Sequence, residues 1–268
     1  MKKILIENIH YKLTKINCYY TISYNYNSPL ISSLIRSIIV SLNNFKIKII
    51  NQTENSLSFH SFSLETLENI LNSITISKKI VEKSKLILAN KATNSLINQL
   101  KFLLKSEDLC FIGYNPEDII IINEELFIVL NPEYLESLNS KKQLLITRPF
   151  TLDSFYQSPE LLQLKNRQNQ QSYPYLLSYK CSYYSLGCLL LYILDQSNEV
   201  VVLNTTYNKS LQTQFQNQEE NKPNQSFLNL IDYINANNDF KYFKYTKFYY
   251  FLIKALKKEP NERYLINI

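Results

Sequence analysis

The sequence predicts an α+β fold in which a small β-rich region precedes a larger, mainly helical one. The first sixty residues alternate short apolar runs with turn residues, a pattern typical of strands, whereas amphipathic helical spacing dominates afterwards. The chain has 268 residues, of which 45% are hydrophobic, enough for a core of its own and typical of a globular protein. We therefore expect one domain made of two parts, residues 1–62 and 63–268.

The N-terminal part is expected to contain strands around one helix. The best strand candidates lie at residues 18–24, 45–50 and 56–62. The helix is predicted at 28–42, because Pro29 suits a first helical turn and leucines and isoleucines follow it at helical spacing. The resulting order is strand, helix, strand, strand.

The C-terminal part is expected to be helical around one buried hairpin. Two fully apolar β-type runs, separated by a polar turn, predict strands at 119–122 and 126–130. Apolar spacing and flanking signals predict helices at 64–73, 86–105, 178–194, 227–235 and 247–257. Residues 204–225 are rich in Asn, Gln, Thr, Ser and Lys and indicate a surface insertion.

The composition restricts the partners and the compartment. No run of 18 or more apolar residues and no signal peptide is found, which favours an intracellular protein, cytoplasmic or cytoskeletal, with an organelle as an alternative. The net charge of +6 suits an acidic partner surface such as RNA or tubulin, but the basic residues are scattered, as on an ordinary solvated surface. The net charge therefore fits either an acidic partner or an ordinary solvated surface.

Cysteine, histidine and glycine residues indicate few sites for ligands. The four cysteines (Cys18, Cys110, Cys181 and Cys188) lack CxxC spacing and are expected to be free, buried thiols. His10 and His60, the only histidines, are placed in two separate strands with structural roles. The chain has two glycines, neither of them before residue 113, so the N-terminal part contains no flexible loop that could hold phosphates.

Three motifs in the C-terminal half occur with mutually consistent spacing. Residues 158–160 (SPE) resemble A-P-E, residues 180–188 (KCSYYSLGC) resemble the K-S-D-V-Y-S-L-G-C start of a central helix, and residues 257–264 (KKEPNERY) resemble a D-P-x-x-R end. The whole chain thus resembles a eukaryotic protein kinase. This resemblance implies a two-lobed fold with a small β-rich N-lobe and a larger, mainly helical C-lobe. It also implies a structural ion pair between Glu160 and Arg263.

The positions that act in catalysis in that family carry other residues here. Residues 111–121 (FIGYNPEDIII) resemble the catalytic loop H-R-D-L-K-P-E-N-I-L-L. The resemblance places Gly113 at the catalytic aspartate, Asn115 at the loop lysine and Asp118 at the asparagine that binds the second magnesium ion. Gly113 has no side chain that could accept a proton.

At three further positions the charged residue of the family is replaced by a neutral one. The D-F-G aspartate falls on Asn131, a poorer magnesium ligand than a carboxylate, and Glu133 lies two residues away. The phosphate-binding lysine falls on Ser23, if residues 19–23 correspond to V-A-I-K. The buried aspartate of the central helix falls on Ser182, which can form a hydrogen bond but cannot carry a charge.

The sequence accordingly predicts a pseudokinase, a non-catalytic structural or scaffold subunit that binds other proteins of an assembly. No cofactor, no metal and no ATP are expected. Two alternatives remain open: a nucleotide-binding regulatory pseudokinase or weak atypical kinase, and a basic module that binds an acidic polymer such as RNA or tubulin.

Overall fold

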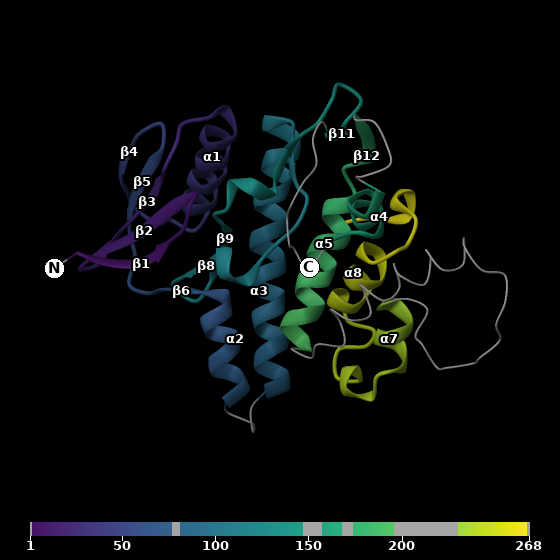
Figure 1. Cartoon of the computed structure of the whole chain (residues 1–268). Helices are drawn as coiled ribbons and strands as arrows, with labels where there is room; N and C mark the ends of the chain where they lie inside the picture. The colour runs from purple at the N-terminus through teal and green to yellow at the C-terminus, as the bar shows by residue number, and fades with distance from the viewer. Residues whose placement is uncertain (1, 77–80, 147–156, 168–173, 196–229, 267–268) are drawn as a thin grey trace.

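The computed structural model describes residues 2–76, 81–146, 157–167, 174–195 and 230–266, and within them the chain has a mixed α+β fold. A sheet and one helix formed by the N-terminal residues lie at one side of the molecule, and most of the helices lie at the other (Figure 1). Among the described residues, no helix is both long and apolar enough to cross a membrane.

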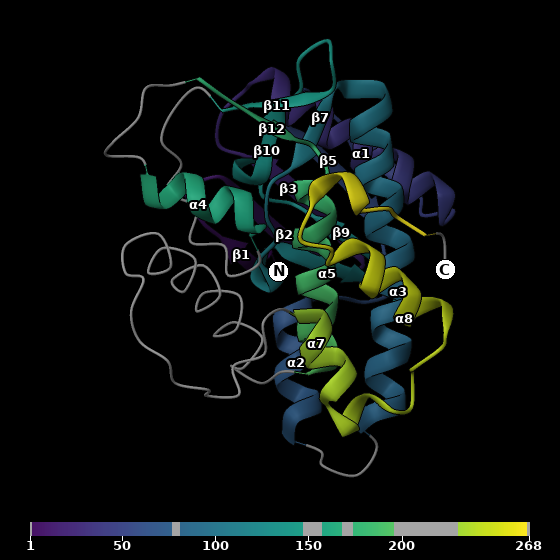
Figure 2. The same ribbon diagram turned by 90° about the vertical axis from the view of Figure 1, so that its right-hand side faces the viewer.

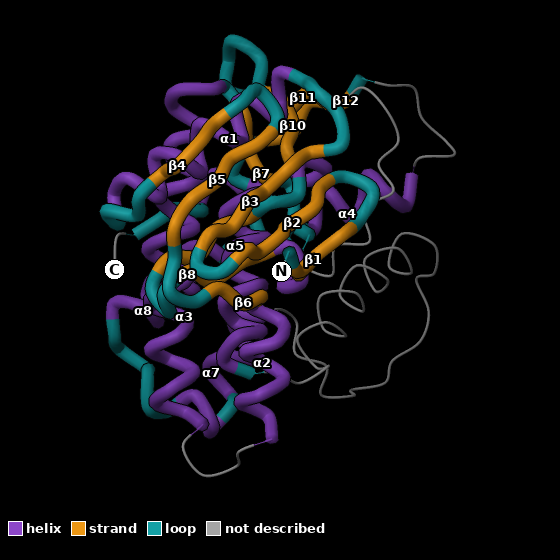
Figure 3. Tube along the Cα trace, turned by 90° about the vertical axis from the view of Figure 1, so that its left-hand side faces the viewer, coloured by secondary structure: helices purple, strands orange, loops and turns teal. Residues whose placement is uncertain are grey.

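The N-terminal residues form one antiparallel sheet of five strands in the order β1-β2-β3-β5-β4 (Figure 3). Its strands are β1 (Lys3–Glu7), β2 (Tyr11–Ile16), β3 (Tyr19–Tyr24), β4 (Ile49–Gln52) and β5 (Ser56–His60). Alternate residues are buried, as strand geometry requires, among them Tyr11 and Leu13 on β2 and Tyr20, Ile22 and Tyr24 on β3. This buried face is therefore rich in tyrosine.

Helix α1 (Pro29–Asn44) lies between the sheet and the helical part and contacts α3. Ser28 is its N-cap: the side chain accepts a hydrogen bond from the backbone N–H of Ile31 at 3.2 Å, and Pro29 follows in the first turn. Its buried face carries Ile31, Leu34, Ile35, Ile38 and Leu42. This spacing buries one stripe of the helix against the rest of the chain.

The helical part is arranged around α5, in which nearly every residue is buried (Figure 2). Its helices are α2 (Leu67–Ile76), α3 (Val81–Phe102), α4 (Pro159–Arg167), α5 (Cys181–Leu194), α7 (Leu230–Ala236) and α8 (Lys247–Ala255). A π-helix (Leu103–Glu107) continues α3. Gly187 allows α5 to approach the chain at the end of α8, because a Cβ atom there would lie 2.9 Å from Leu256 Cδ2.

Short strands connect these helices. They form a three-stranded sheet, β6-β8-β9, and two pairs, β10-β7 and β11-β12. The strands are β6 (Leu64–Thr66), β7 (Leu109–Phe111), β8 (Ile119–Ile122), β9 (Leu126–Val129), β10 (Leu135–Ser137), β11 (Gln143–Ile146) and β12 (Tyr175–Ser178). Both strands of the β8–β9 hairpin are buried along their whole length, as their continuous apolar runs predict.

Most predicted elements are confirmed, and several details were wrong. The helix expected at 64–73 begins at Leu67, because residues 64–66 pair with β8. The strand expected at 45–50 begins at Ile49, because the preceding residues close the end of α1, with Ile47 N donating to Leu42 O at 2.9 Å. Strands β1 and β2 were not predicted. Helix α5 begins at Cys181 rather than 178, because residues 175–178 pair with β11.

Other predictions concern single residues, or residues that the structure does not describe. Cys110, Cys181 and Cys188 are buried, but Cys18 is exposed in the turn between β2 and β3, so the expectation of a buried thiol was wrong there. His10 lies in the β1–β2 turn and not in a strand. The insertion expected at 204–225 lies outside the described residues. The domain boundary near residue 62 stays a prediction.

Candidate functional site

The candidate site forms around the β8–β9 hairpin, in which one Asn-Pro-Glu turn precedes β8 and another follows β9. Asn115 and Asn131 begin short 3-10 turns, and each side-chain Oδ1 accepts a backbone N–H two residues later, Glu117 at 3.2 Å and Glu133 at 3.0 Å. The hairpin register pairs Ile119 with Val129. Both turns therefore meet at the open end of the hairpin.

The carboxylate of Asp118 is the centre of this site. It accepts hydrogen bonds from Tyr11 Oη at 2.8 Å, Asn131 Nδ2 at 3.0 Å and Tyr134 Oη at 3.0 Å. We call these four residues the Asp118 cluster. Asp118 is 6% exposed, and a carboxylate so buried requires hydrogen-bond donors in place of water. All three donors are neutral groups.

Two more contacts join the N-terminal sheet to the hairpin and its second turn. Tyr24 Oη, on β3, donates to the backbone oxygen of Leu130 at 3.0 Å. His10 Nε2, in the β1–β2 turn, lies 3.0 Å from Glu133 Oε1. Together with Tyr11 on β2, these residues connect three successive segments of the sheet region to the turns around Asp118. At these contacts, side chains of the sheet region meet the hairpin and its second turn directly.

Burial keeps the tyrosine hydroxyls of this interface protonated. Loss of hydration raises the pKa of Tyr11, Tyr24 and Tyr134 well above the ordinary value of 10, and the nearby charge of Asp118 raises each pKa further. Each hydroxyl therefore remains a hydrogen-bond donor or a neutral group at physiological pH. A tyrosinate beside a buried carboxylate would add a second negative charge.

The structure brings together only some of the residues that the sequence singled out. Asp118 and Asn131 are in contact, Asn115 caps the neighbouring turn, and Gly113 is buried in the segment before it. Ser23 does not join them. It lies on the opposite face of β3 from the buried Tyr24, and its assignment to the phosphate-lysine position stays a prediction.

Ser182 forms a hydrogen bond, and its assignment to the position of the buried aspartate stays a prediction. Its Oγ donates to the backbone oxygen of Tyr179 at 2.7 Å, within its own helix start. The residue of α5 that contacts the loop before Gly113 is Ser185, whose Oγ lies 3.4 Å from the backbone oxygen of Ile112. The loop contact thus comes from a position one helical turn further along α5.

A second polar centre ties α4 to the C-terminal residues. Arg263 is 0% exposed and forms a two-pronged ion pair with Glu160, in which Nη2 lies 2.9 Å from Oε2. The remaining guanidinium hydrogens are donated to backbone oxygens of Lys180, Lys257 and Lys258. The Arg263 guanidinium also lies 4.9 Å from the centre of the Tyr184 ring. Every N–H of this buried cation has an acceptor.

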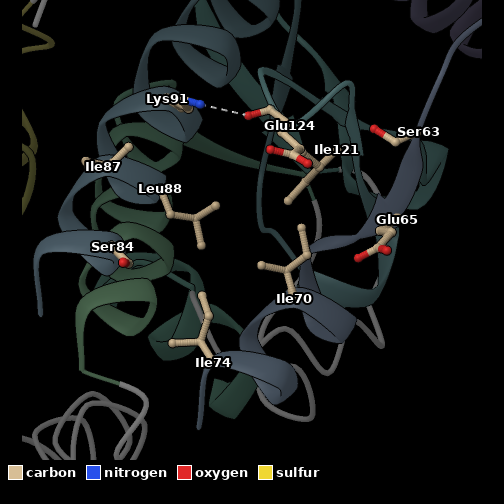
Figure 4. Close-up of a pocket in the computed structure, with 10 residues that line it drawn as sticks. All are labelled: Ser63, Glu65, Ile70, Ile74, Ser84, Ile87, Leu88, Lys91, Ile121 and Glu124. Atoms are coloured by element: carbon tan, nitrogen blue, oxygen red, sulfur yellow. Dashed lines mark hydrogen bonds between the residues drawn. The ribbon is translucent and has the colours of Figure 1, made fainter. Parts of the chain in front are cut away.

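A separate cavity of about 350 Å³ opens between α2 and α3, away from the Asp118 cluster (Figure 4). Its walls are mostly aliphatic, from Ile70, Ile74, Ile87, Leu88 and Ile121. Lys91 at its edge donates to the backbone oxygen of Glu124 at 3.1 Å and to Glu125. Within the described ranges, no group of three or more His, Cys, Asp or Glu side chains is placed to bind a metal ion.

Comparison of the sequence with models of known protein families gives no match, and comparison with curated proteins finds none that is significantly similar. The function is therefore inferred from the residues of this chain and their geometry.

Sequence reasoning missed the tyrosines that complete the site. Tyr11 is 107 residues from Asp118 in the chain, and nothing local to either residue indicates the contact. One signal was present: Tyr11 and Leu13 alternate with polar residues, as do Tyr20, Ile22 and Tyr24, which places those side chains on one face of a hairpin. An inward row of tyrosines predicts hydroxyls that need buried partners.

Proposed function

We propose that this chain is a catalytically inactive, kinase-like subunit that acts as a scaffold in a larger protein assembly. The observation that carries the proposal is the contact between Asp118 and Asn131, the residues that the resemblance assigns to the two metal-ligand positions of the kinase family. They hydrogen-bond to each other, and tyrosines complete the carboxylate's shell. The site thus satisfies its own polar groups.

The energetics support this proposal. Magnesium binding at Asp118 would require its carboxylate to give up existing hydrogen bonds, and a bond to a charged group contributes about 1.5–3 kcal/mol. Three such bonds are present, and Asn131 offers a neutral amide at the position to which the resemblance assigns the carboxylate ligand of the family.

The β1–β2 turn, which lies in a segment without glycine, supports the same proposal. Asn8 Oδ1 accepts the backbone N–H groups of His10 and Tyr11, each at 2.9 Å. Asn25 Nδ2 donates to the backbone oxygens of Asn8 and Ile9 at 3.1 Å. Backbone N–H groups that would point at phosphates in a nucleotide-binding loop are here used within the turn.

An exposed aromatic row offers a surface for a partner protein. Tyr19, His60 and Phe62 pack edge to face, with ring centres 5.6 and 5.4 Å apart, and Phe62 is 81% exposed. Aromatic side chains are enriched among the residues that dominate protein interfaces. A scaffold with its internal site closed would bind through such a surface.

The experiment is a native pulldown of the full-length chain followed by identification of the companions. We expect a stable assembly that survives washing at moderate salt. Phe62→Ser should reduce the companion yield without changing the melting temperature, whereas Leu176→Ser, an exposed apolar residue on β12, should leave the yield unchanged. Recovery of the chain alone would contradict the scaffold function.

A thermal-shift assay distinguishes the scaffold proposal from the nucleotide-binding alternative. A ligand at one hundred times its dissociation constant stabilises the native state by about 2.7 kcal/mol, which is readily detected. We expect no change in melting temperature with millimolar ATP and magnesium. A clear rise would favour a nucleotide-binding regulatory protein, and a companion that is lost steeply with salt would favour an acidic polymer.

A further inference from the structure

A second cavity, of about 280 Å³, lies at the C-terminal end of α3 and is separate from the Asp118 cluster. The π-helix that follows α3, the turn before β11 and the start of α5 form its walls. Three lysines (Lys101, Lys105 and Lys142) and two tyrosines (Tyr179 and Tyr183) line it, together with two leucines. We call it the lysine–tyrosine pocket.

The charge around this pocket is positive. No carboxylate is among the described residues that line it. Of the nearby acidic residues, Asp108 pairs with Lys142, and Glu107 is engaged on the α1 side, where Arg36 Nε donates to it at 2.8 Å. Burial and the neighbouring charge of Lys105 lower the pKa of Lys101. An anion beside Lys101 and Lys105 would offset the repulsion between them.

The other half of the pocket is apolar and aromatic. The rings of Tyr179 and Tyr183 pack edge to face with centres 5.6 Å apart. Burial raises the pKa of Tyr183, so its hydroxyl stays neutral. Leu104 and Leu138 complete this side. A ligand that fits both halves has a flat apolar body and a charged end.

The backbone at the pocket is locally irregular and held in place. The π-helix ends with Asp108 N–H bonded to the Leu103 oxygen, and such turns occur frequently at functional sites. The oxygen of Leu104 accepts a hydrogen bond from Lys142 Nζ at 3.1 Å. Lys142 itself has φ 55°, a conformation usually left to Gly or Asn. These contacts fix one lysine at the rim.

We propose that the lysine–tyrosine pocket binds a small organic phosphate, a single aromatic ring bearing a phosphate group. Lys142 is paired with Asp108, but Lys101 and Lys105 together suit a doubly charged phosphate better than a single carboxylate, because each cation adds to the attraction. The aromatic wall suits the ring. The volume is near the lower end of the usual range for ligand pockets, which favours one ring over a larger molecule.

The test is calorimetric titration of the full-length chain with phenyl phosphate, phenol and inorganic phosphate. We expect saturable binding of phenyl phosphate at millimolar concentration or below, and at least about fivefold weaker binding of the other two, each of which lacks one half of the ligand. Equal binding of inorganic phosphate would overturn the proposal, because it would indicate a cluster of cations only. No binding of phenyl phosphate would overturn it as well.

Matched variants locate the binding. Lys105 is exposed and Lys105→Glu is expected to fold, while binding of phenyl phosphate weakens about five- to tenfold. Lys48→Glu makes the same charge change at an exposed position before β4 and is expected to bind like the unmodified protein. Equal losses in both variants would show that the overall charge, and not this pocket, attracts the ligand.

Discussion

The Glu160–Arg263 pair and the Asp118 cluster are two buried polar centres that satisfy a carboxylate in different ways. Glu160 faces a fully buried cation through two hydrogen bonds. Asp118 faces only neutral donors, two tyrosine hydroxyls and one amide. The first centre joins α4 to the chain's C-terminal residues, and the second joins the sheet to the β8–β9 hairpin.

The difference predicts how each centre responds to loss of a partner. Removal of one member of a buried ion pair leaves an uncompensated charge, which is strongly destabilising. Removal of one neutral donor from Asp118 leaves two others in place, so the loss should approach the contribution of a single bond. The two centres are thus expected to separate clearly in unfolding experiments.

The largest effect is expected for Arg263→Met. The guanidinium is replaced by an apolar chain, which leaves Glu160 without its cation and removes the Arg263 hydrogen bonds to the backbone oxygens of Lys257 and Lys258. We expect the free energy of unfolding to fall by about 3–5 kcal/mol, measured by urea denaturation.

Two variants control this result. Lys254→Met, at an exposed position on α8, should change the free energy of unfolding by less than about 0.5 kcal/mol. Glu160→Met combined with Arg263→Met should recover part of the loss, because no charge then remains buried. A loss in Arg263→Met no larger than in Lys254→Met would show that the pair contributes little.

An intermediate effect is expected for Tyr11→Phe. The ring keeps its packing while Asp118 loses one donor, so urea denaturation should show a loss of about 1.5–3 kcal/mol. Tyr19→Phe, at an exposed position on β3, should stay within about 0.5 kcal/mol of the unmodified protein. Equal losses in the two variants would argue against a hydrogen bond between the sheet and the hairpin.

The smallest effect is a change in the response to alkaline pH. The folded-state pKa of Tyr11 is raised above its unfolded value of 10, so its contribution is fully present below pH 10 and is lost as pH rises further. Each such tyrosine lowers the free energy of unfolding by about 1.4 kcal/mol per pH unit in that range.

Tyr11→Phe removes one of these groups and should therefore have a shallower alkaline slope, by about 0.7 kcal/mol per pH unit on average between about pH 9 and about pH 11 and by up to about 1.4 above that range. Denaturation curves at several pH values from about 9 to about 11 would measure both slopes. The Asp118 cluster should show this dependence, whereas Arg263→Met should keep the slope of the unmodified protein. Identical slopes in Tyr11→Phe and the unmodified protein would contradict a buried hydroxyl at Tyr11.

The elements that the sequence predicted well carry local signals. Helix α1 has a capping serine, a proline and a stripe of apolar residues, and the β8–β9 hairpin has two continuous apolar runs. Strand β6 has only three residues and exists because it pairs with β8, more than fifty residues later. Strand β1 is a largely exposed edge strand, without the clear alternation that identifies half-buried strands.

In the candidate site, too, contacts between residues close in the chain were predictable, and contacts between distant residues were not. Asp118 and Asn131 lie on either side of one hairpin, so their meeting follows from its register. The contacts of Tyr11 and Tyr24 span more than one hundred residues, and they depend on how the sheet packs against the hairpin. Ser23 lies one residue from Tyr24, whose side chain faces inward, and adjacent side chains of a strand lie on opposite faces.

The two Asn-Pro-Glu turns have a consequence for the order of folding. They cap a hairpin whose own contacts close within about twenty residues, so the entropy lost in forming it is small. The bond from Tyr11 to Asp118 closes a separation of 107 residues and gains energy only after both sides are built. We therefore expect the hairpin with its turns to form early and the sheet to dock on it late, so that Tyr11→Phe accelerates unfolding far more than it slows folding.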